Sequence, residues 1–439
     1  MSQVFIKRIS LLFLLGSLGL SLIGKEKPVI STAGFVCIDN CFDTRQTVSK
    51  REGHEFLYPK KWDCAACCND KGEPWRDVNH QASYSIFPIN ARAKFRIEGE
   101  PIFCTDKTYA VVAADFRGVD DQTINLFRLR ESYILFDWPK TDLLIGQTFY
   151  PLAIDDCGPN TVAYAKSGPL DTWTFCPQIR LVQDLNSQWA DPADRLTVAI
   201  GSHGRITRFQ TPNGSSAQAL RNALVPIVHL QWRHYINKDC FIGLCLEEQR
   251  LRPLLKTVSP DADGVYYDQR GTAFMEAHAA MYGQLKSDCL VLRGKVTFLQ
   301  DGHELGYISG YAVESYNVDT KCQTFTPLRS ISCWFDVDVF PENDCMPGCL
   351  VGFARNLGAG KPLYRDATTN TLITYGDAVD IGTFVKCAPR LWVHKGVLDI
   401  GAEVDWSRAW YGDLDDCGAV NQICHVDNLR FQLSLFYRF

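Results

Sequence analysis

The chain ends on Asn428-Leu-Arg-Phe-Gln-Leu-Ser-Leu-Phe-Tyr-Arg-Phe439, and this stretch alternates between two kinds of side chain. One set is wholly apolar or aromatic: Leu429, Phe431, Leu433, Leu435, Tyr437 and Phe439. The residues between them are mostly polar: Arg430, Gln432, Ser434, Phe436 and Arg438. Successive side chains of a strand point to opposite faces, so this period predicts a strand with one apolar face.

The same alternation recurs along the chain, most clearly over residues 89–98. There the apolar set is Ile89, Ala91, Ala93, Phe95 and Ile97, and the polar set is Asn90, Arg92, Lys94, Arg96 and Glu98. A strand of a soluble sandwich alternates in this way, and so does a membrane strand between lipid and a wet lumen. The last strand favours the membrane, because its terminal aromatics Tyr437 and Phe439 resemble the assembly signal of bacterial outer-membrane barrels.

The N-terminal segment is typical of an export signal. Lys7 and Arg8 precede an apolar run over residues 9–24, which is shorter than the roughly 20 residues of a spanning helix. We expect a signal peptide over residues 1–24, cleaved after Ser21 or Gly24. Its loss removes two cations and changes the formal charge from -5 to -7. The alternative is a buried helix or an uncleaved anchor.

The composition excludes several classes of protein. Of the 439 residues, 46% are hydrophobic and 22% are charged, which is too apolar for a disordered chain. The mean hydropathy of -0.12 is too low for a bundle of membrane helices. The isoelectric point of about 6.0 provides no general basic field, so we expect no nucleic-acid partner.

Sixteen segments with strand character fill the rest of the chain. They predict an all-β fold, a transmembrane antiparallel up-and-down β-barrel, as a single domain over residues 25–439. An even number suits a single-chain bacterial barrel, whose first and last strands pair to remove the open edge. The expected strands cover residues 30–42, 84–98, 109–117, 124–136, 143–150, 173–182, 196–201, 225–236, 241–250, 272–286, 290–299, 328–339, 350–354, 384–393, 397–406 and 428–439.

The lengths of the linkers agree with this series. Short linkers at 138–142, 237–239 and 394–396 each follow an even strand, and the long linkers each follow an odd one. Barrels of this class have short periplasmic turns and long extracellular loops. The expected long loops cover residues 46–81, 151–171, 202–222, 253–271, 301–326, 356–382 and 411–426.

No catalytic motif is present, so we expect neither an enzyme nor a cofactor. Gly358-Ala-Gly-Lys361 lacks the spacing of a phosphate-binding loop, and His303-Glu304 has no second histidine four residues on. The nine histidines do not cluster in the sequence. Those on expected strands need be no more than polar groups of the lumen: His229, His234, His278 and His394.

All 18 cysteines follow the signal segment, and an even, high count in an exported chain predicts disulfides. The candidate pairs are Cys345 with Cys349 and Cys417 with Cys424. The cluster Cys64-Ala-Ala-Cys67-Cys68 has zinc binding as an alternative. No second Cys-x-x-Cys or histidine pair completes such a site, so we expect no metal.

Six short segments resemble DcaP-like porins in their order and spacing along nearly the whole mature chain. They are Asp43-Thr-Arg-Gln46, Phe127-Arg-Leu-Arg-Glu-Ser-Tyr133, Leu144-Ile-Gly-Gln-Thr-Phe-Tyr150, Gly310-Tyr-Ala-Val313, Pro327-Leu-Arg-Ser-Ile-Ser-Cys-Trp334 and Gly352-Phe-Ala-Arg-Asn-Leu-Gly358. The resemblance implies a homotrimeric, sixteen-stranded outer-membrane porin for small anionic solutes such as dicarboxylates. Such a porin also requires outer-membrane lipid and the barrel-assembly machinery. The chain differs from many members in its high cysteine content and in lacking heptads before the first strand.

Alternation also assigns charges to the lumen. A basic wall is expected on the N-terminal and closing strands: Arg92, Lys94, Arg96, Arg128, Arg130, Arg180, Arg430 and Arg438. An acidic wall is expected opposite it: Asp336, Asp338, Asp399, Glu403 and Asp405. Opposed walls would set a transverse field that selects solutes by charge, whereas the plain alternative is that any wet lumen collects charge.

Two further features concern the width of the channel and contacts between subunits. The loop 151–171, which carries Asp155 and Asp156, corresponds to the loop that folds inward and narrows the channel in porins; the alternative is a surface loop. Glu131 falls on the apolar face of its expected strand, where lipid contact costs on the order of a few kcal/mol. A subunit interface would relieve this cost, and the alternatives are a shift of register or a position near the rim.

These observations favour a passive diffusion porin for small hydrophilic, anionic solutes in the outer membrane of a Gram-negative-type bacterium. The alternative is a cysteine-rich structural envelope protein that is cross-linked by disulfides. An outer-membrane phospholipase or protease agrees least with the sequence, because no Ser/His or Asp/His constellation is present.

Overall fold

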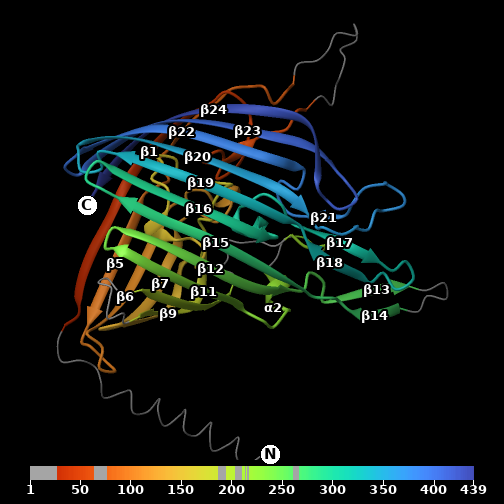
Figure 1. Ribbon diagram of the computed structural model, residues 1–439, viewed down its shortest axis with the longest axis horizontal. Helices are drawn as coiled ribbons and strands as arrows, with labels where there is room; N and C mark the ends of the chain where they lie inside the picture. Colours follow the sequence, from red (N-terminus) through yellow and green to blue (C-terminus); the bar gives the residue numbers. More distant parts are fainter. Residues whose placement is uncertain are drawn as a thin grey trace, which may run out of the picture.

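The computed structural model describes residues 27–63, 77–185, 194–202, 210–212, 214, 217–260 and 266–439. The expected signal peptide and the cluster Cys64, Cys67 and Cys68 lie outside these residues. The described strands form a closed antiparallel barrel, and long segments project beyond one of its ends (Figure 1). No helix among the described residues is long and apolar enough to cross a membrane.

The wall of the barrel follows sequence order and closes where the first strand pairs with the last. Because β4 and β5 pair end to end with β1, they form one interrupted strand, and the barrel has 16 strands, as the sequence predicts. The wall segments are β1 (Val29–Asp43), β4 (Ser83–Phe87), β5 (Arg92–Gly99), β6 (Lys107–Asp115), β7 (Arg128–Trp138), β8 (Thr141–Phe149), β9 (Phe175–Asp184), β10 (Arg195–Gly201), β11 (Ile227–Asn237), β12 (Cys240–Leu251), β15 (Phe274–Lys286), β16 (Leu290–Gln300), β19 (Arg329–Val339), β20 (Cys345–Gly358), β22 (Ile381–Lys395), β23 (Leu398–Leu414) and β24 (Val420–Arg438).

Smaller elements lie in the linkers at one end of the barrel. There β17, β18 and β21 form a sheet of their own, and β13 pairs with β14 (Figure 1). The linker elements are β2 (Thr47–Lys50), β3 (Glu55–Pro59), η2 (Asp121–Thr123), η3 (Asp155–Cys157), α2 (Gln218–Arg221), β13 (Lys256–Pro260), β14 (Tyr266–Arg270), η4 (His303–Leu305), β17 (Tyr311–Tyr316), β18 (Gln323–Pro327) and β21 (Thr374–Tyr375). The long loop expected at 411–426 is wrong, because β23 and β24 stay paired to Leu414 and Val420 and leave only a short turn.

Inward and outward side chains differ as the alternation predicts. On β12, Ile242, Leu244 and Leu246 are exposed on the outer surface, whereas Cys245 and Glu247 are buried on the inner one. An apolar outer band matches lipid, which offers no hydrogen bonds to polar side chains. The described outer face is therefore that of a membrane barrel.

The second strand departs from the expected alternation at Pro88. β1 residues 36–38 lie opposite residues 88–91, so the second strand carries one extra residue there. Proline has no N–H for the ladder, and one extra residue reverses the faces beyond it. Ile89 is consequently buried in a cluster with Cys41 and Phe87, and its expected position on the apolar outer face is wrong.

The largest hydrophobic cluster lies inside the barrel. Tyr150, Leu152 and Cys157 of the segment after β8 pack there against Ile227 of β11 and Leu299 of β16. A segment that fills the lumen needs apolar residues as well as charges, because its own backbone must be covered and hydrogen-bonded.

Candidate functional site

The segment between β8 and β9, residues 150–174, crosses the interior of the barrel. The N–H of Asn160 donates to Asp336 on β19 at 3.1 Å, and the indole N–H of Trp392 on β22 donates to the carbonyl of Asn160 at 3.1 Å. The N–H of Val162 donates to Glu403 on β23 at 2.8 Å. The loop thus leaves the wall at β8 and is held by β19, β22 and β23 on the opposite side of the lumen. We call residues 150–174 the inner loop.

Four of the five residues expected to form an acidic wall are neutralised by partners on the same side of the barrel. Arg390 on β22 contacts Asp336 at 2.6 Å and Asp338 at 2.5 Å. Arg293 contacts Asp338 as well, at 2.8 Å. Asp405 contacts Lys386 at 2.7 Å, and Asp399 contacts His394 at 2.6 Å and Arg438. The fifth, Glu403, accepts the N–H of Val162 instead.

Six of the eight members of the expected basic wall have a carboxylate partner too, among them Arg438 with Asp399, Lys94 with Glu131 and Arg96 with Glu98. Arg128 and Arg130 on β7 both bind Asp115 on β6, at 2.7 and 2.8 Å, and Arg430 binds Asp43 at 2.7 Å. The expectation of two opposed walls of single sign is therefore wrong. The physical reason is that a buried charge without a counter-charge costs several kcal/mol, so neighbouring strands supply one.

Three cations on or near the inner loop lack such a carboxylate. No described carboxylate lies within 4.0 Å of Arg92, Arg180 or Lys166, and all three are half-buried. Arg180 donates to the side-chain oxygen of Gln178 and to the carbonyl of Phe149, both at 2.8 Å. Neutral acceptors orient this guanidinium and leave its positive charge uncompensated.

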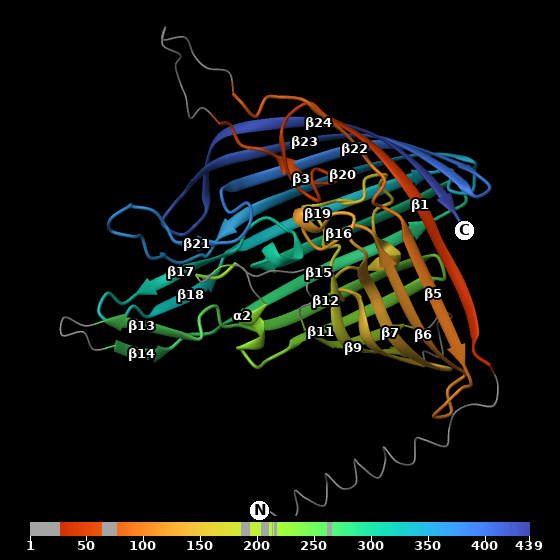
Figure 2. The same ribbon diagram turned by 180° about the vertical axis from the view of Figure 1, so that it is seen from behind.

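Aromatic rings hold the other two cations. The guanidinium of Arg92 lies 5.0 Å from the ring centre of Phe35, and the ammonium of Lys166 lies 3.7 Å from that of Trp173. Cation–π contacts attract without adding negative charge. Lys94 and Arg96 extend this surface along β5, with carboxylates at 3.5 Å (Glu131) and 2.9 Å (Glu98). Strands β5 to β9 are successive neighbours in this wall, and β5, β6, β7 and β9 are labelled in Figure 2.

Tyr164 of the inner loop lies among arginines. Its hydroxyl binds Arg130 and, at 3.3 Å, Arg128, while its ring faces the guanidinium of Arg117. Burial alone would raise the pKa of this phenol, but the three guanidinium groups outweigh it and lower the pKa to about 7. Burial lowers the pKa of nearby Lys166 to about 8.

A cavity of about 310 Å³ adjoins the inner loop. Charges of both signs line it, among them Lys50, Arg128, Asp171 and Glu304, together with Tyr164. Asp155 and Asp156 are exposed in η3 at the start of the inner loop, and Asp156 contacts Arg233 at 2.5 Å. The loop thus brings carboxylates as well as Lys166 into the lumen.

Glu131 faces the lumen, and the expected outward position at a subunit interface is wrong. The pairing of β6 with β7 skips Arg130, since Ala113 lies opposite Glu131 and Ala114 opposite Leu129. This bulge turns Arg130 and Glu131 to the same side, where Glu131 accepts a hydrogen bond from Thr148 at 2.9 Å. A shift of register, one of the two open alternatives, is the explanation.

Neither candidate disulfide forms. Every described cysteine is a free thiol. Cys345 and Cys349 lie on one strand, about 13 Å apart at 3.3 Å per residue, and a disulfide needs Cα atoms within about 7 Å. Cys417 lies in the turn beyond Val420 and Cys424 lies further down β24, so this pair is also separated along the hairpin.

The terminal aromatics lie where the barrel closes. Phe439 and Gly34 exchange backbone hydrogen bonds of 2.9 and 3.1 Å, and Tyr437 pairs with Val36. Both aromatic side chains are exposed on the outer surface. Their proposed role as an assembly signal is compatible with this position.

Analysis of the sequence does not identify several residues that pair with the expected lumen charges. Asp115, Lys386 and Arg390 neutralise charges that the alternation identifies, and Tyr164 sits on an irregular loop. Asp115 has a usable signal, because it is an inward carboxylate directly opposite Arg128 in the hairpin. The spacing of the histidines in the sequence also gives no sign that His278 on β15 and His303 on η4 both adjoin Glu304.

Solved structures of outer-membrane channels share this architecture. The outer membrane channel DcaP of Acinetobacter baumannii superposes with a TM-score of 0.64 at 12% identity, over 95% of this chain and 99% of that one. The barrel is a porin fold. An anion-selective porin from Comamonas acidovorans gives a TM-score of 0.52 at 8% identity, over 94% of this chain and 100% of that one. OmpT of Vibrio cholerae gives 0.52 at 8%, over 95% and 99%. No protein-family model and no curated protein matches the sequence.

Proposed function

We propose that the chain is a passive channel for small anionic solutes in the outer membrane of a Gram-negative-type bacterium. The apolar outer band suits lipid, and the inner loop narrows the passage. The similarity to the channel DcaP and to an anion-selective porin supports the same class of function. Cleavage of residues 1–24, the barrel-assembly machinery and a homotrimeric state belong to this proposal.

The set of uncompensated cations carries the anion preference. Arg92, Arg180 and Lys166 have neutral or aromatic partners, whereas Arg128, Arg130 and Arg430 each pair with a carboxylate. A passing carboxylate or phosphate can therefore replace water at these groups without displacing a protein carboxylate. Net charge predicts the opposite preference, but screening over about 8 Å makes the local arrangement decisive.

Reversal potentials in a planar bilayer test this function. The double variant Arg92→Gln, Arg180→Gln should lower the ratio of anion to cation permeability several-fold, and the change should shrink at high salt. Arg408→Gln is the matched control, because Arg408 lies on the outer side of β23 with Asp427 at 2.7 Å. A protein that forms no channels would contradict the proposed function. Channels whose selectivity is the same in the double variant would contradict the role of these arginines.

A second candidate function, a disulfide-cross-linked envelope protein, has one observation in its favour. Four free cysteines from distant parts of the chain lie at the end of the barrel that carries the short turns: Cys104, Cys240, Cys289 and Cys345. Three of them are exposed, so they are accessible for bridges between chains. Disulfide-linked multimers on non-reducing gels that vanish with a Cys104→Ser, Cys289→Ser, Cys345→Ser variant would support this function.

A further inference from the structure

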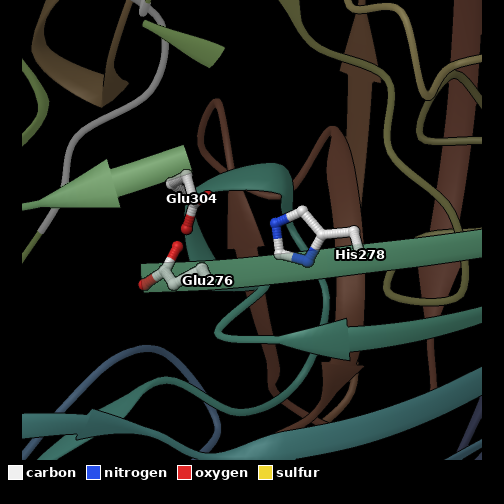
Figure 3. Close-up of side chains that lie close together, drawn as sticks. All are labelled: Glu276, His278 and Glu304. Carbon is white, nitrogen blue, oxygen red and sulfur yellow. The ribbon is translucent and has the colours of Figure 1, made fainter. Parts of the chain in front are cut away.

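A cluster of buried acidic and imidazole side chains lies apart from the cations of the channel. Glu276 and His278 project inward from β15, and Glu304 belongs to η4, which follows β16 (Figure 3). One donor atom from each of the three lies within 4.8 Å of the other two. Their side chains are almost fully buried, at 0%, 1% and 5% exposure. We call these residues the Glu276 cluster.

The imidazole of His278 is the feature that hydrogen bonding does not explain. Neither of its nitrogens has a partner among the described residues, although the ring is buried. A neutral imidazole offers one donor and one acceptor, and a protonated imidazole offers two donors. Buried polar atoms of this kind are normally paired. Figure 3 shows the ring directed from β15 toward the two carboxylates, so the missing partner belongs between them.

Surrounding groups orient the two carboxylates but do not occupy all of their oxygen atoms. The side-chain amide of Gln249 on β12 donates to Glu276 at 2.7 Å and to Glu304 at 2.9 Å. The second oxygen of Glu304 has no hydrogen bond in the described structure, with His303 at 3.5 Å. In metal sites, hydrogen bonds from surrounding groups orient the ligand side chains in the same way. Here they orient two carboxylates that keep free lone pairs beside an imidazole without a partner.

Three carboxylates gather at the cluster. Asp301 lies next to it and contacts His303, so the buried carboxylates of Glu276, Asp301 and Glu304 lie close together. No described lysine or arginine lies within 4.0 Å of these three carboxylates. A divalent cation can bind carboxylates that are gathered in this way.

We propose that Glu276, His278 and Glu304 bind one divalent transition-metal ion, with zinc as the ion that fits their donors best. One imidazole and two carboxylates suit zinc, whereas calcium and magnesium prefer oxygen donors alone. In a tetrahedral site, zinc bonds of about 2.0–2.2 Å place ligand atoms about 3.3–3.6 Å apart. The observed upper bound of 4.8 Å therefore requires the side chains to close by at most about 1.5 Å.

The cluster also has an entry path. His303 and Glu304 line the cavity of about 310 Å³ that adjoins the inner loop, so an ion from solution can reach the site through the channel. Three protein ligands leave the fourth position of zinc for water or for a carboxylate of a passing solute. Binding would also fix η4 and the linker to β17 against β15. This inference does not depend on the proposed transport function.

Titration of zinc into the full-length, EDTA-treated protein in detergent micelles tests the site. We expect one zinc ion per chain by calorimetry, and at least tenfold weaker binding in His278→Ala and in Glu304→Gln. His394→Gln is the control, because His394 pairs with Asp399 at 2.6 Å on another strand and should bind zinc as the wild type does. Equal zinc affinity in all of these proteins, or no zinc uptake by the wild type, would overturn the proposal.

X-ray absorption at the zinc edge identifies the ligand atoms in the wild-type protein, so it tests the site even if a variant does not assemble. Heat-modifiable mobility on gels reports assembly for each variant. A first shell of nitrogen and oxygen with imidazole scattering in the wild type supports the Glu276 cluster. A sulfur shell would assign the ion to cysteines such as Cys64, Cys67 and Cys68 and would refute the proposed ligands.

Discussion

The carboxylate of Glu403 on β23 accepts the backbone N–H groups of Val162 and Ala163, at 2.8 and 3.4 Å. Glu403 is 4% exposed, and no described lysine or arginine pairs with it. A side chain that alternation alone places in a charged wall is thus the anchor of the inner loop. Backbone N–H donors of the loop take the place of a cationic partner for Glu403, and these hydrogen bonds hold the loop across the lumen.

Removing this anchor should widen the channel. In Glu403→Ala the two N–H groups lose their acceptor, at a cost of about 1–3 kcal/mol, and the middle of the inner loop should loosen. We expect a higher single-channel conductance with normal heat-modifiable mobility. Glu342→Ala, which changes an exposed carboxylate, should leave conductance unchanged. Equal conductance in Glu403→Ala would show that the loop does not set the width.

Anion preference should fall as the pH rises from about 6 to about 9. Lys166 loses its positive charge as the pH passes its pKa of about 8, and Tyr164 gains a negative charge as the pH passes its pKa of about 7. Both changes make the lumen less positive, so both act in the same direction. The reversal potential under a salt gradient should follow this range.

A variant with fixed charges provides the control for this pH dependence. Lys166→Arg with Tyr164→Phe keeps one positive charge and no titrating phenol at these positions, so its reversal potential should stay nearly constant with pH. The same pH profile in the double variant and the wild type would mean that other groups titrate in the passage.

Replacing Arg128 and Arg130 together with glutamine should impair assembly. Alternation alone predicts a change of selectivity in an intact barrel, but both arginines bind Asp115, which is 0% exposed. A buried carboxylate that loses its cations destabilises a fold by about 3–5 kcal/mol. We expect less heat-modifiable barrel and a lower midpoint of urea unfolding. Arg96→Gln, whose side chain is 38% exposed, should assemble normally; equal loss in both would rule out the Asp115 pairs as the cause.

A side chain at Gly34 should block closure of the barrel. A Cβ there would lie 2.4 Å from the carbonyl oxygen of Arg92 and 2.7 Å from the ring of Phe439, which real contacts do not allow. Gly34→Val should therefore abolish the heat-modifiable species. Gly99→Val is the matched control, since a Cβ at Gly99 meets nothing within 4 Å. Normal assembly of Gly34→Val would show that the ends can close without this contact.

Much of the barrel could be predicted from the sequence, because the alternation of side chains along each strand indicates which face the lumen and which face outward. Leu429, Phe431 and Leu433 are exposed to the outside, and Arg430 and Gln432 between them are buried in the lumen. The same local rule failed at Pro88 and at Arg130, where one extra residue reverses the faces. Bulges depend on the pairing strand, so alternation within one strand does not reveal them.

The sequence by itself determined the class of fold, the sixteen strands and the side of most wall residues, because a period of two residues is a local property. Only the tertiary structure decided which charges are balanced. Asp43 meets Arg430, and Val162 meets Glu403, across hundreds of residues of chain. Likewise Glu276 and Glu304 meet only after β15 and β16 pair and η4 folds back over their ends. Coulomb and hydrogen-bond energies depend on distances in space, and those exist only once the barrel has closed.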